Sequence, residues 1–401
     1  MSHMECPTPP GFVENAGFRP GFNFLDMLEF PSQSWHIWGW GVSLVFAAAT
    51  WIAALVLIWK HYLASLNVKS YEFVFVFSKS DPKTQRHKLR VILYPPVYST
   101  LSWFSYLRYD YSTTIEFFAT VFEAFAVYNL YTCLQAYLQP FRKEAERTKE
   151  PMTARMFHMF TVHVKSKWGM HYRIITDILV LQFPIWSIID SFISIFAEYK
   201  GVYCQGSYSF RGAYVYLVII NFISLSVILS ALFTYLAIYR NEWFEGKIKA
   251  HGMFWCVKGP IMFIFYFGQI LLTGLTSAKV IRGTDGTNSA DSVAWPADAV
   301  KHGLYVIIVC TVMVVDIGLM FKYFGPTDNI QHARENGTEK MSVWRAITDG
   351  YLVYIPEFFY NLLCCGADSY RLMRKRVELR KRKNREKMSL GRSNSSSAGN
   401  H

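Results

Sequence analysis

Residues 37–59 read IWGWGVSLVFAAATWIAALVLIW, a stretch of 23 residues without a charged side chain. A helix needs about 20 mostly apolar residues to cross the hydrocarbon core of a bilayer. His36 and Lys60 flank the stretch and give it polar ends. The pattern therefore predicts a membrane-spanning helix over about 36–60.

The composition of the whole chain also indicates a membrane protein. Of 401 residues, 52% are hydrophobic and 17% aromatic, and only 17% are charged, against roughly a quarter in ordinary soluble domains. The net charge of +12 fits either nucleic-acid binding or basic loops at an anionic leaflet. The N-terminus MSHMECPTPPGF has no basic region followed by an apolar core, so no cleavable signal peptide is predicted.

The predicted fold class is an all-α membrane protein, a bundle of seven transmembrane helices within residues 36–325. Several segments carry a charged residue, whose cost of about 2.5–3.5 kcal/mol on insertion scales is offset by apolar neighbours. Six segments follow the first span, at about 91–107, 115–138, 174–197, 213–238, 253–277 and 302–321.

The basic residues predict the orientation. Of the 41 Lys and Arg, 33 fall in the alternate segments that begin with 60–90, seven fall in the other connections, and Lys258 lies inside a span. The positive-inside rule then places the N-terminal segment 1–35 outside and the C-terminus in the cytoplasm. This distribution favours a membrane surface over nucleic acid as the partner of the charge, and we predict no nucleic-acid partner.

The orientation sorts two further features. The sequons at Asn336 and Asn394 fall on the cytoplasmic side, so neither is predicted to be glycosylated. Cys6 and Cys204 are the only cysteines in predicted outside segments. A disulfide between them and two unpaired thiols both remain open.

Two adjacent prolines interrupt the predicted second span. Pro95 and Pro96 remove backbone donors inside the membrane, which is tolerated where neighbouring helices, hydroxyls or a wet cavity satisfy the carbonyls. Ser99, Thr100 and Ser102 are local donors for this purpose. A bent helix that lines a pathway and a simple packing kink are equally compatible; Pro184 marks a similar position in the fourth span.

Several motifs together resemble the family of the organic solute transporter alpha subunit and transmembrane protein 184. Their order and spacing carry the resemblance over about residues 36–325. The motifs are Pro82–x–x–Gln85–Arg86–x–x–x–Arg90, Pro96–x–Tyr98–Ser99–x–x–Ser102–Trp103, FEAFAVYNL at 122–130 and FWCVKGPIMFIFYFGQILL at 254–272. The resemblance implies seven spans, an outside N-terminus, transport of organic solutes and a single-span partner subunit.

The chain departs from that family pattern at three places. Residues 67–79 look like an insertion in the first inner loop. Ser187 stands where a basic residue is expected after Gln182, and Val312 stands where a glutamate is common, with Asp316 one turn on. These departures indicate that the substrate differs from that of other members.

Polar residues inside the spans are the predicted solute pathway, because such groups usually face the bundle interior or a wet cavity. Glu116 and Glu123 share nearly one face of the third span, whereas Asn129 faces another side. Asp190 shares a face with Ser187. Interhelical hydrogen bonding is the alternative role for each. The predicted pathway residues are Glu123, Asn129, Gln182, Asp190, Lys258, Gln269 and Asp316.

Lys258 has two alternative placements. It pairs with Glu123 across the bundle, or it extends to the inner interface, as long lysine side chains do. A role in solute binding is compatible with either placement.

The region after the last span contains three predicted segments. Residues 326–370 form a cytoplasmic juxtamembrane segment that lies at the leaflet and ends near Cys364 and Cys365, which are palmitoylation candidates. The basic run 371–387 is a second membrane signal, for which a solvated helix is the alternative. Residues from 389 are predicted to be disordered.

Transport of organic solutes, namely amphipathic anions or steroid- or lipid-like molecules, by facilitated diffusion or exchange is the predicted function. A seven-span receptor and a scaffold or trafficking protein acting through its tail are the alternatives. No P-loop, metal-ligand spacing or nucleophile motif is present, so we predict no enzyme activity, no cofactor and no metal. Expected partners are anionic inner-leaflet lipids, a small organic solute and a single-span subunit or a second copy. Plasma membrane and vacuolar or endosomal membranes are all compatible.

Overall fold

A computed structural model describes most of the predicted membrane region. The described residues are 35–63, 77–79, 82–139, 141–142, 152–156, 160–164, 167–203, 210, 212–285, 294–295, 297–326, 339–341, 356 and 374.

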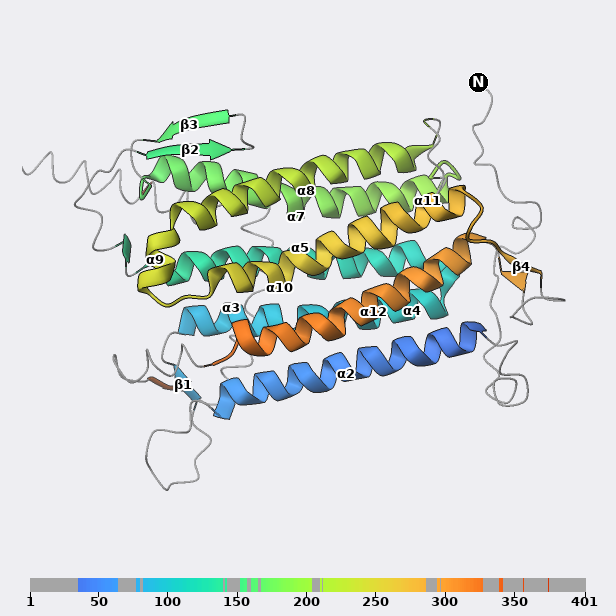
Figure 1. Ribbon diagram of the computed structural model, residues 1–401, viewed down its shortest axis with the longest axis horizontal. Coiled ribbons are helices and arrows are strands. Elements are labelled where there is room, and N and C mark those ends of the chain that lie inside the picture. Colours follow the sequence, from blue (N-terminus) through green and yellow to red (C-terminus); the bar gives the residue numbers. More distant parts are fainter. Residues whose placement is uncertain are drawn as a thin grey trace, which may run out of the picture.

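Long helices that run side by side form the body of the molecule (Figure 1). Five are continuous: α2 (Trp35–Leu63), α5 (Ser112–Tyr137), α7 (Met170–Tyr199), α8 (Ala213–Ile238) and α12 (Ala297–Tyr323). Two passages are composite: α3 (Pro82–Ile92) continues into α4 (Tyr94–Leu107), and α10 (Ala250–Phe263) continues through the π-helix η3 (Ile264–Leu271) into α11 (Leu272–Ser277). The short elements are the 3₁₀ turn η2 (Tyr109–Tyr111) and α9 (Arg240–Glu245).

Short antiparallel strand pairs lie at the ends of the bundle. β1 (Phe77–Lys79) pairs with β6 (Glu339–Met341), and β2 (Met152–Met156) pairs with β3 (Phe160–Val164). β4 (Thr284–Asp285) pairs with β5 (Ala294–Trp295).

Six helical passages in the described residues are long and apolar enough to cross a membrane. They correspond to the predicted first and third to seventh spans. The predicted span at 91–107 falls on α4, whose 14 residues cover only about 21 Å of a hydrocarbon core about 30 Å thick. The seventh crossing thus depends on α3 and α4 together, and it stays a prediction.

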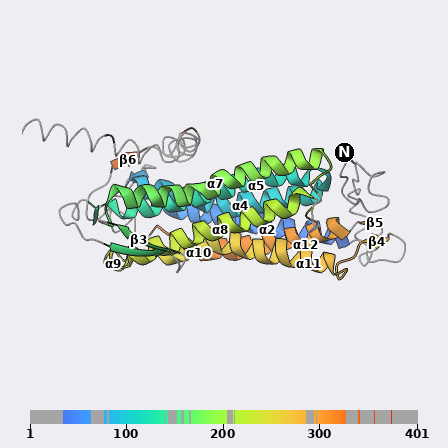
Figure 2. The same cartoon turned by 90° about the horizontal axis from the view of Figure 1, so that it is seen from above.

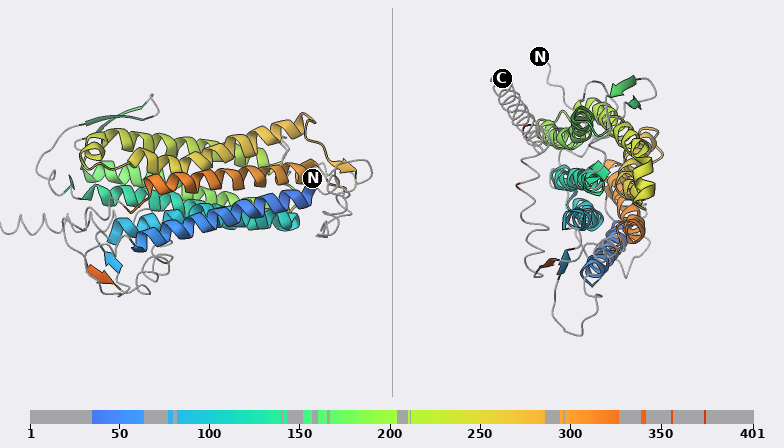
Figure 3. Two further views of the ribbon diagram at one scale, coloured as in Figure 1. Left: turned by 60° about the horizontal axis from the view of Figure 1, so that its bottom comes forward. Right: turned by 90° about the vertical axis from the view of Figure 1, so that its left-hand side faces the viewer.

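The helices form two layers. α4, α5 and α7 pack in one layer, and α2, α12, α10 and α8 pack in the other, as Figures 2 and 3 show from different sides. We call the half of the bundle that contains Ser112 and Tyr199 the outer half, and the half that contains Tyr137 and Met170 the inner half, after the predicted orientation.

The break between α3 and α4 coincides with the two predicted prolines. Pro95 and Pro96 occupy the first turn of α4, where the missing N–H groups are tolerated. The hydroxyls of Ser99 and Thr100 both donate to the Pro96 carbonyl, at 3.1 and 2.7 Å. Both hydroxyls thus bond the carbonyl of Pro96, whereas the carbonyls that lose their helical donors to the two prolines are those of Val91 and Ile92.

Three contacts fix how α3 and α4 lie against α12. Ser105 Oγ lies 3.1 Å from His302 Nε2, the Cys310 thiol donates to the Ser99 carbonyl at 3.7 Å, and Lys88 Nζ donates to the Gly325 carbonyl at 3.2 Å. The partners run in opposite directions along the two helices. Lys88 is fully buried, and its ammonium donates to the Gly325 carbonyl just after the end of α12. A cation is favoured at this position because the C-terminal end of a helix carries partial negative charge.

Candidate functional site

Polar side chains form a stripe along α5 in the outer half of the bundle. Thr113, Glu116, Thr120 and Glu123 recur at spacings of three and four residues, which places them on one face of the helix. These four side chains line the same cavity. The periodicity of the sequence thus explains why one helix presents two carboxylates to one space.

α7 presents a second stripe to the same space. Ser187, Asp190, Ser191 and Ser194 follow the same spacing and line the cavity opposite the α5 residues. α5 and α7 pack directly against each other. The two facing stripes, which include the carboxylates of Glu116, Glu123 and Asp190, give this space a polar lining.

The cavity has a volume of about 130 Å³ and receives side chains from both layers. Its apolar walls consist mainly of aromatic rings, including Phe183 and Phe265. The remaining lining residues are Tyr98, Phe117, Tyr203, Asn221, Leu225, Ile261, Ile264, Gln269 and Tyr305.

A second pocket of about 90 Å³ adjoins the first toward the outer end and is lined also by Lys301 and His302. Residues that line both pockets mark the place where they meet, and we call this set the waist. The waist consists of Glu116, Asp190, Tyr203, Asn221, Gln269 and Tyr305.

The charges at the outer pocket are partly compensated. Lys301 Nζ lies 3.3 Å from Asp298 Oδ1, and His302 Nδ1 lies 3.6 Å from Glu116 Oε1. Tyr203 lies beyond the end of α7, and burial raises the pKa of its phenol above the ordinary value. Its hydroxyl therefore stays protonated and remains a hydrogen-bond donor.

The π-helix η3 brings Gln269 to the waist. Such widened turns are rare and occur frequently at functional sites. Tyr305 of α12 packs over Gly268, where an added Cβ would lie only 2.7 Å from the Tyr305 ring. This close approach sets the distance between η3 and α12 at the cavity wall.

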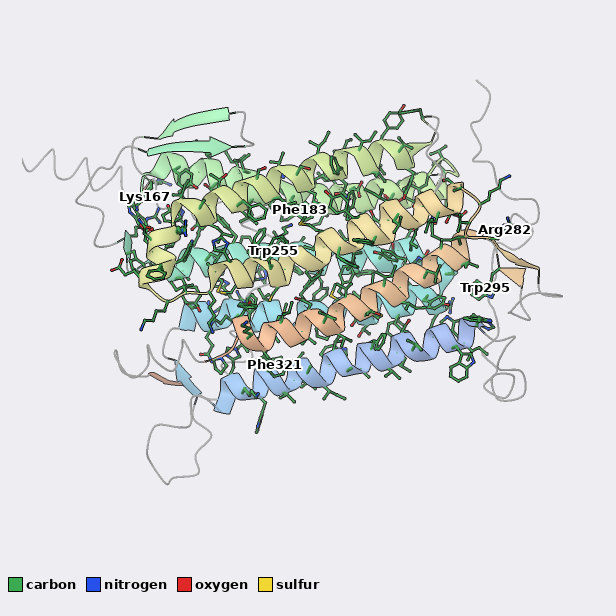
Figure 4. All side chains as sticks on the ribbon, in the orientation of Figure 1. Lys167, Phe183, Trp255, Arg282, Trp295 and Phe321 are labelled. Atoms are coloured by element: carbon green, nitrogen blue, oxygen red, sulfur yellow. The ribbon has the colours of Figure 1, made fainter. Side chains whose placement is uncertain are left out.

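Lys258 lies behind the inner wall of the cavity. Its side chain is 0% exposed, and its ammonium lies 3.9 Å from the centre of the Phe183 ring. Phe183 and Pro184 lie near the middle of α7, Phe183 is buried, and Figure 4 shows it midway along the bundle. The cation thus stacks on an aromatic face, and the alternative in which Lys258 extends to the inner interface is wrong.

The predicted pairing of Lys258 with Glu123 is only partly realised. The two opposite charges attract each other, but no contact within 4.0 Å joins them, and Lys258 Nζ has no hydrogen-bond partner among the described residues. Glu123 is consequently free to face the cavity.

Three of the predicted pathway residues lie together, and the others do not line this cavity. Glu123, Asp190 and Gln269 line it. Gln182 instead exchanges hydrogen bonds with Ser224, donating to its carbonyl at 2.9 Å and accepting from its hydroxyl at 2.8 Å. Gln182 therefore joins α7 to α8, which is the alternative role considered above.

Asn129 and Asp316 occupy separate buried places. Asn129 Oδ1 lies 3.2 Å from His87 Nδ1, so this amide joins α5 to α3. Asp316 is 2% exposed, and neither carboxylate oxygen has a hydrogen-bond partner within the described part of the chain. The predicted lipidation and disulfide positions lie outside the described residues, as do both sequons. They are Cys364, Cys365, Cys6, Cys204, Asn336 and Asn394.

The hydroxyl-bearing half of the lining was not predicted. Thr113, Thr120, Ser191 and Ser194 were missed because small hydroxyl residues are common in spans and carry little cost. Their spacing relative to Glu116 and Asp190 was a usable signal. Tyr203 and Tyr305 of the waist and His302 of the second pocket had no local signal, since only the packing of distant helices brings them to these places.

The inner half contains a tight polar network around Asp177. Asp177 Oδ1 accepts hydrogen bonds from the Tyr131 hydroxyl at 2.6 Å and from Gln135 Nε2 at 3.0 Å. Arg173 Nε lies 3.9 Å from Asp177 Oδ2, and Arg173 donates to Gln135 Oε1 at 3.1 Å. The pocket beside this network measures only about 30 Å³.

Comparison with known proteins gives one family and a distant relative. The family model described as organic solute transporter Ostalpha matches residues 39–329. A transmembrane protein 184 homolog of Dictyostelium discoideum is 22% identical over 315 residues, which are 75% of this chain and 56% of that relative. The match thus covers little more than half of the relative's length. No solved structure matches this chain.

Proposed function

The chain belongs to the organic solute transporter Ostalpha family, and from that premise we propose that it moves organic solutes across a membrane through the cavity that α5 and α7 line together with helices of the other layer. The observation that carries the proposal is a polar cavity enclosed by helices that are long and apolar enough to span a bilayer. Ionisable side chains such as these carboxylates are expensive within a bundle of spanning helices and mark solute pathways.

Facilitated diffusion or exchange is the proposed mode, because the sequence contains no nucleotide-binding motif. Phe183 and Lys258 separate the cavity from the inner half, so passage requires them to move. Pro184 lies directly beside Phe183 within α7 and removes one helical hydrogen bond there. The proposed moving element is therefore α7 around residues 183–184.

The resemblance predicts amphipathic anions or steroid- or lipid-like molecules as solutes. The two pockets together are smaller than the ~300 Å³ at the lower end of ordinary small-molecule sites. A steroid-sized solute would therefore need the helices to separate. An anion would in addition meet Glu116, Glu123 and Asp190, so neutral steroid- or lipid-like molecules are the better supported of the predicted solutes.

We also propose seven crossings, with the N-terminus outside and the C-terminus in the cytoplasm. α3 and α4 run in line between the same two ends as the longer helices (Figure 1), which supports a composite second crossing. The charge distribution supports the orientation. Protease or tag accessibility of residues 139–169 from the outer side would contradict it.

The proposed partners are lipids and a protein subunit. We propose contact with anionic lipids at the inner leaflet and assembly with a single-span subunit or a second copy. Purification from native membranes through a C-terminal affinity tag tests the proposed assembly. A co-purifying single-span protein would support the single-span subunit, and a dimer would support the second copy.

Uptake into proteoliposomes tests the transport function. We expect the wild-type chain to carry a labelled organic solute from a panel of neutral, anionic and cationic amphipathic compounds. Glu123→Gln should alter that flux, because it removes a charge from the cavity wall. Glu245→Gln is the matched control, since Glu245 lies exposed on α9. Absence of protein-dependent flux for the whole panel, with and without a co-purified partner, would contradict transport and favour a receptor or scaffold role.

A further inference from the structure

The waist of the cavity contains acceptor atoms without donors. Asp190 Oδ1 and Glu116 Oε1 are both shielded from solvent, and neither has a hydrogen-bond partner among the described residues. The contact of Glu116 Oε1 to His302 Nδ1 measures 3.6 Å, which is too long for a hydrogen bond. Buried acceptors without donors are costly, so a ligand that supplies N–H groups gains directly.

The charge of the lining has the sign that suits a cation. The described side chains around both pockets include three carboxylates, Glu116, Glu123 and Asp190, and one Lys or Arg, Lys301. Lys301 is already in contact with Asp298, and Lys258 lies behind the wall where it offsets Glu123. Among the described residues, Glu116 and Asp190 therefore remain without a cation of their own within 4.0 Å, apart from the imidazole of His302 beside Glu116.

Aromatic rings complete the walls around these carboxylates. Tyr98, Tyr203 and Tyr305 lie near the waist, and Phe183 and Phe265 lie toward the inner wall. Ring faces attract ammonium groups, and this attraction reaches about 2 kcal/mol or more in desolvated sites. The same rings accommodate an alkyl chain.

We propose that the waist binds the ammonium group of a small primary alkylamine. Two of its three N–H donors would reach Glu116 and Asp190, and the third would reach the side-chain carbonyl of Asn221 or Gln269. The alkyl chain would extend toward Phe183 and Phe265. The pocket volumes of about 130 and 90 Å³ accept a chain of a few carbons. This inference rests on the proposed transport function only in naming the substrate class.

The test compares three ligands that share a four-carbon chain: n-butylamine, butyltrimethylammonium and butyrate. Binding to the full chain in lipid nanodiscs is measured by titration calorimetry. We expect n-butylamine to bind at least tenfold more tightly than either of the others, because only it offers both positive charge and N–H donors. Equal or tighter binding of butyrate would overturn the charge argument, and equal binding of butyltrimethylammonium would overturn the donor argument.

Variants locate the site. Asp190→Asn and Glu116→Gln should each weaken n-butylamine binding at least tenfold, and Glu245→Gln should leave it unchanged. Thermal unfolding without ligand shows whether each variant is folded. If Asp190→Asn and Glu116→Gln fold poorly, Asp190→Glu serves as the second test, because it retains the charge and should keep measurable n-butylamine binding. Unchanged amine binding in the folded Asp190→Asn and Glu116→Gln variants would overturn the proposal.

The outcomes also separate this inference from the proposed function. Flux of neutral or anionic solutes without amine binding would contradict the amine site and leave transport intact. Amine binding without flux of any solute would support the site and contradict transport.

Discussion

Two aspartates on α7 lie in opposite kinds of surroundings. Asp177, in the inner half, accepts hydrogen bonds from Tyr131 and Gln135 and lies beside Arg173. Asp190, in the outer half, faces a cavity with one oxygen unpartnered among the described residues. The same residue type on the same helix thus serves packing at one end and an open site at the other.

The difference between the surroundings of Asp177 and Asp190 indicates which half of the bundle is rigid. A satisfied buried network has one good arrangement, and breaking it leaves several groups unpaired. An unsatisfied cavity wall has few interactions to lose and can exchange water for a ligand. The inner half is therefore expected to determine stability, and the outer half to determine function.

The largest expected effect comes from replacing each of the two aspartates by alanine in separate variants. Asp177→Ala should lower the free energy of unfolding by about 3–5 kcal/mol, because it leaves Arg173, Tyr131 and Gln135 without their shared acceptor. Asp190→Ala should change it by less than about 1 kcal/mol and impair solute binding instead. Unfolding by SDS titration in mixed micelles measures both. Equal losses in the two variants would remove the distinction between the halves.

Lys258 lies between the two halves, and replacing it should change the free energy of unfolding in the direction opposite to that expected for Asp177→Ala. Lys258→Met removes a fully buried ammonium that has no hydrogen bond to the described residues, and it should be neutral or raise stability by about 1–4 kcal/mol. Flux should fall at the same time, since Glu123 loses its nearest counter-charge. Lys249→Met, on an exposed residue, is the control. A large loss of stability in Lys258→Met would show that the cation is well paired.

The outer half still has tightly packed contacts away from the cavity. At Gly303 of α12 an added Cβ would lie 2.8 Å from the Tyr106 ring, whereas at Gly274 of α11 it would meet no atom of the described residues within 4 Å beyond its chain neighbours and its own helix backbone. Gly303→Ala should therefore destabilise by about 1–3 kcal/mol through overpacking. Gly274→Ala should be neutral or stabilise by up to about 1 kcal/mol through helix propensity. Thermal unfolding compares the two, and a neutral Gly303→Ala would indicate that Tyr106 moves freely.

The smallest expected effect concerns the link between α7 and α8. A double-mutant cycle with Gln182→Leu and Ser224→Ala should give a coupling energy of about 0.6 kcal/mol, the average for polar contacts between membrane helices. Flux should be retained because Gln182 does not line the cavity. A loss of flux in the folded Gln182→Leu variant would return Gln182 to the solute pathway.

Hydropathy and periodicity predicted the positions of most helices and one polar face of the cavity from the sequence. The apolar runs predicted six helices that meet the length and composition needed to span, and the proline pair predicted the interruption between α3 and α4. The spacing of Glu116 and Glu123 predicted a shared face on α5. These features are local, because helix geometry alone relates residues a few positions apart.

Other features depended on contacts between distant helices. Only packing shows that Lys258 lies against Phe183, that Gln182 bonds Ser224, and that Tyr305 of α12 closes over Gly268 of η3. The π-helix itself has no clear signal in the sequence.

The sequence by itself determined that this chain lies in a membrane, where its helices run and which faces carry carboxylates, because the cost of burying charge and the 3.6-residue period act along the chain. The tertiary structure decided which of those faces meet and leave a cavity and which are satisfied by partners. The reason is that hydrogen bonding and packing are settled between helices far apart in the sequence, such as α5 against α7 for the cavity and α4 against α12 for the break.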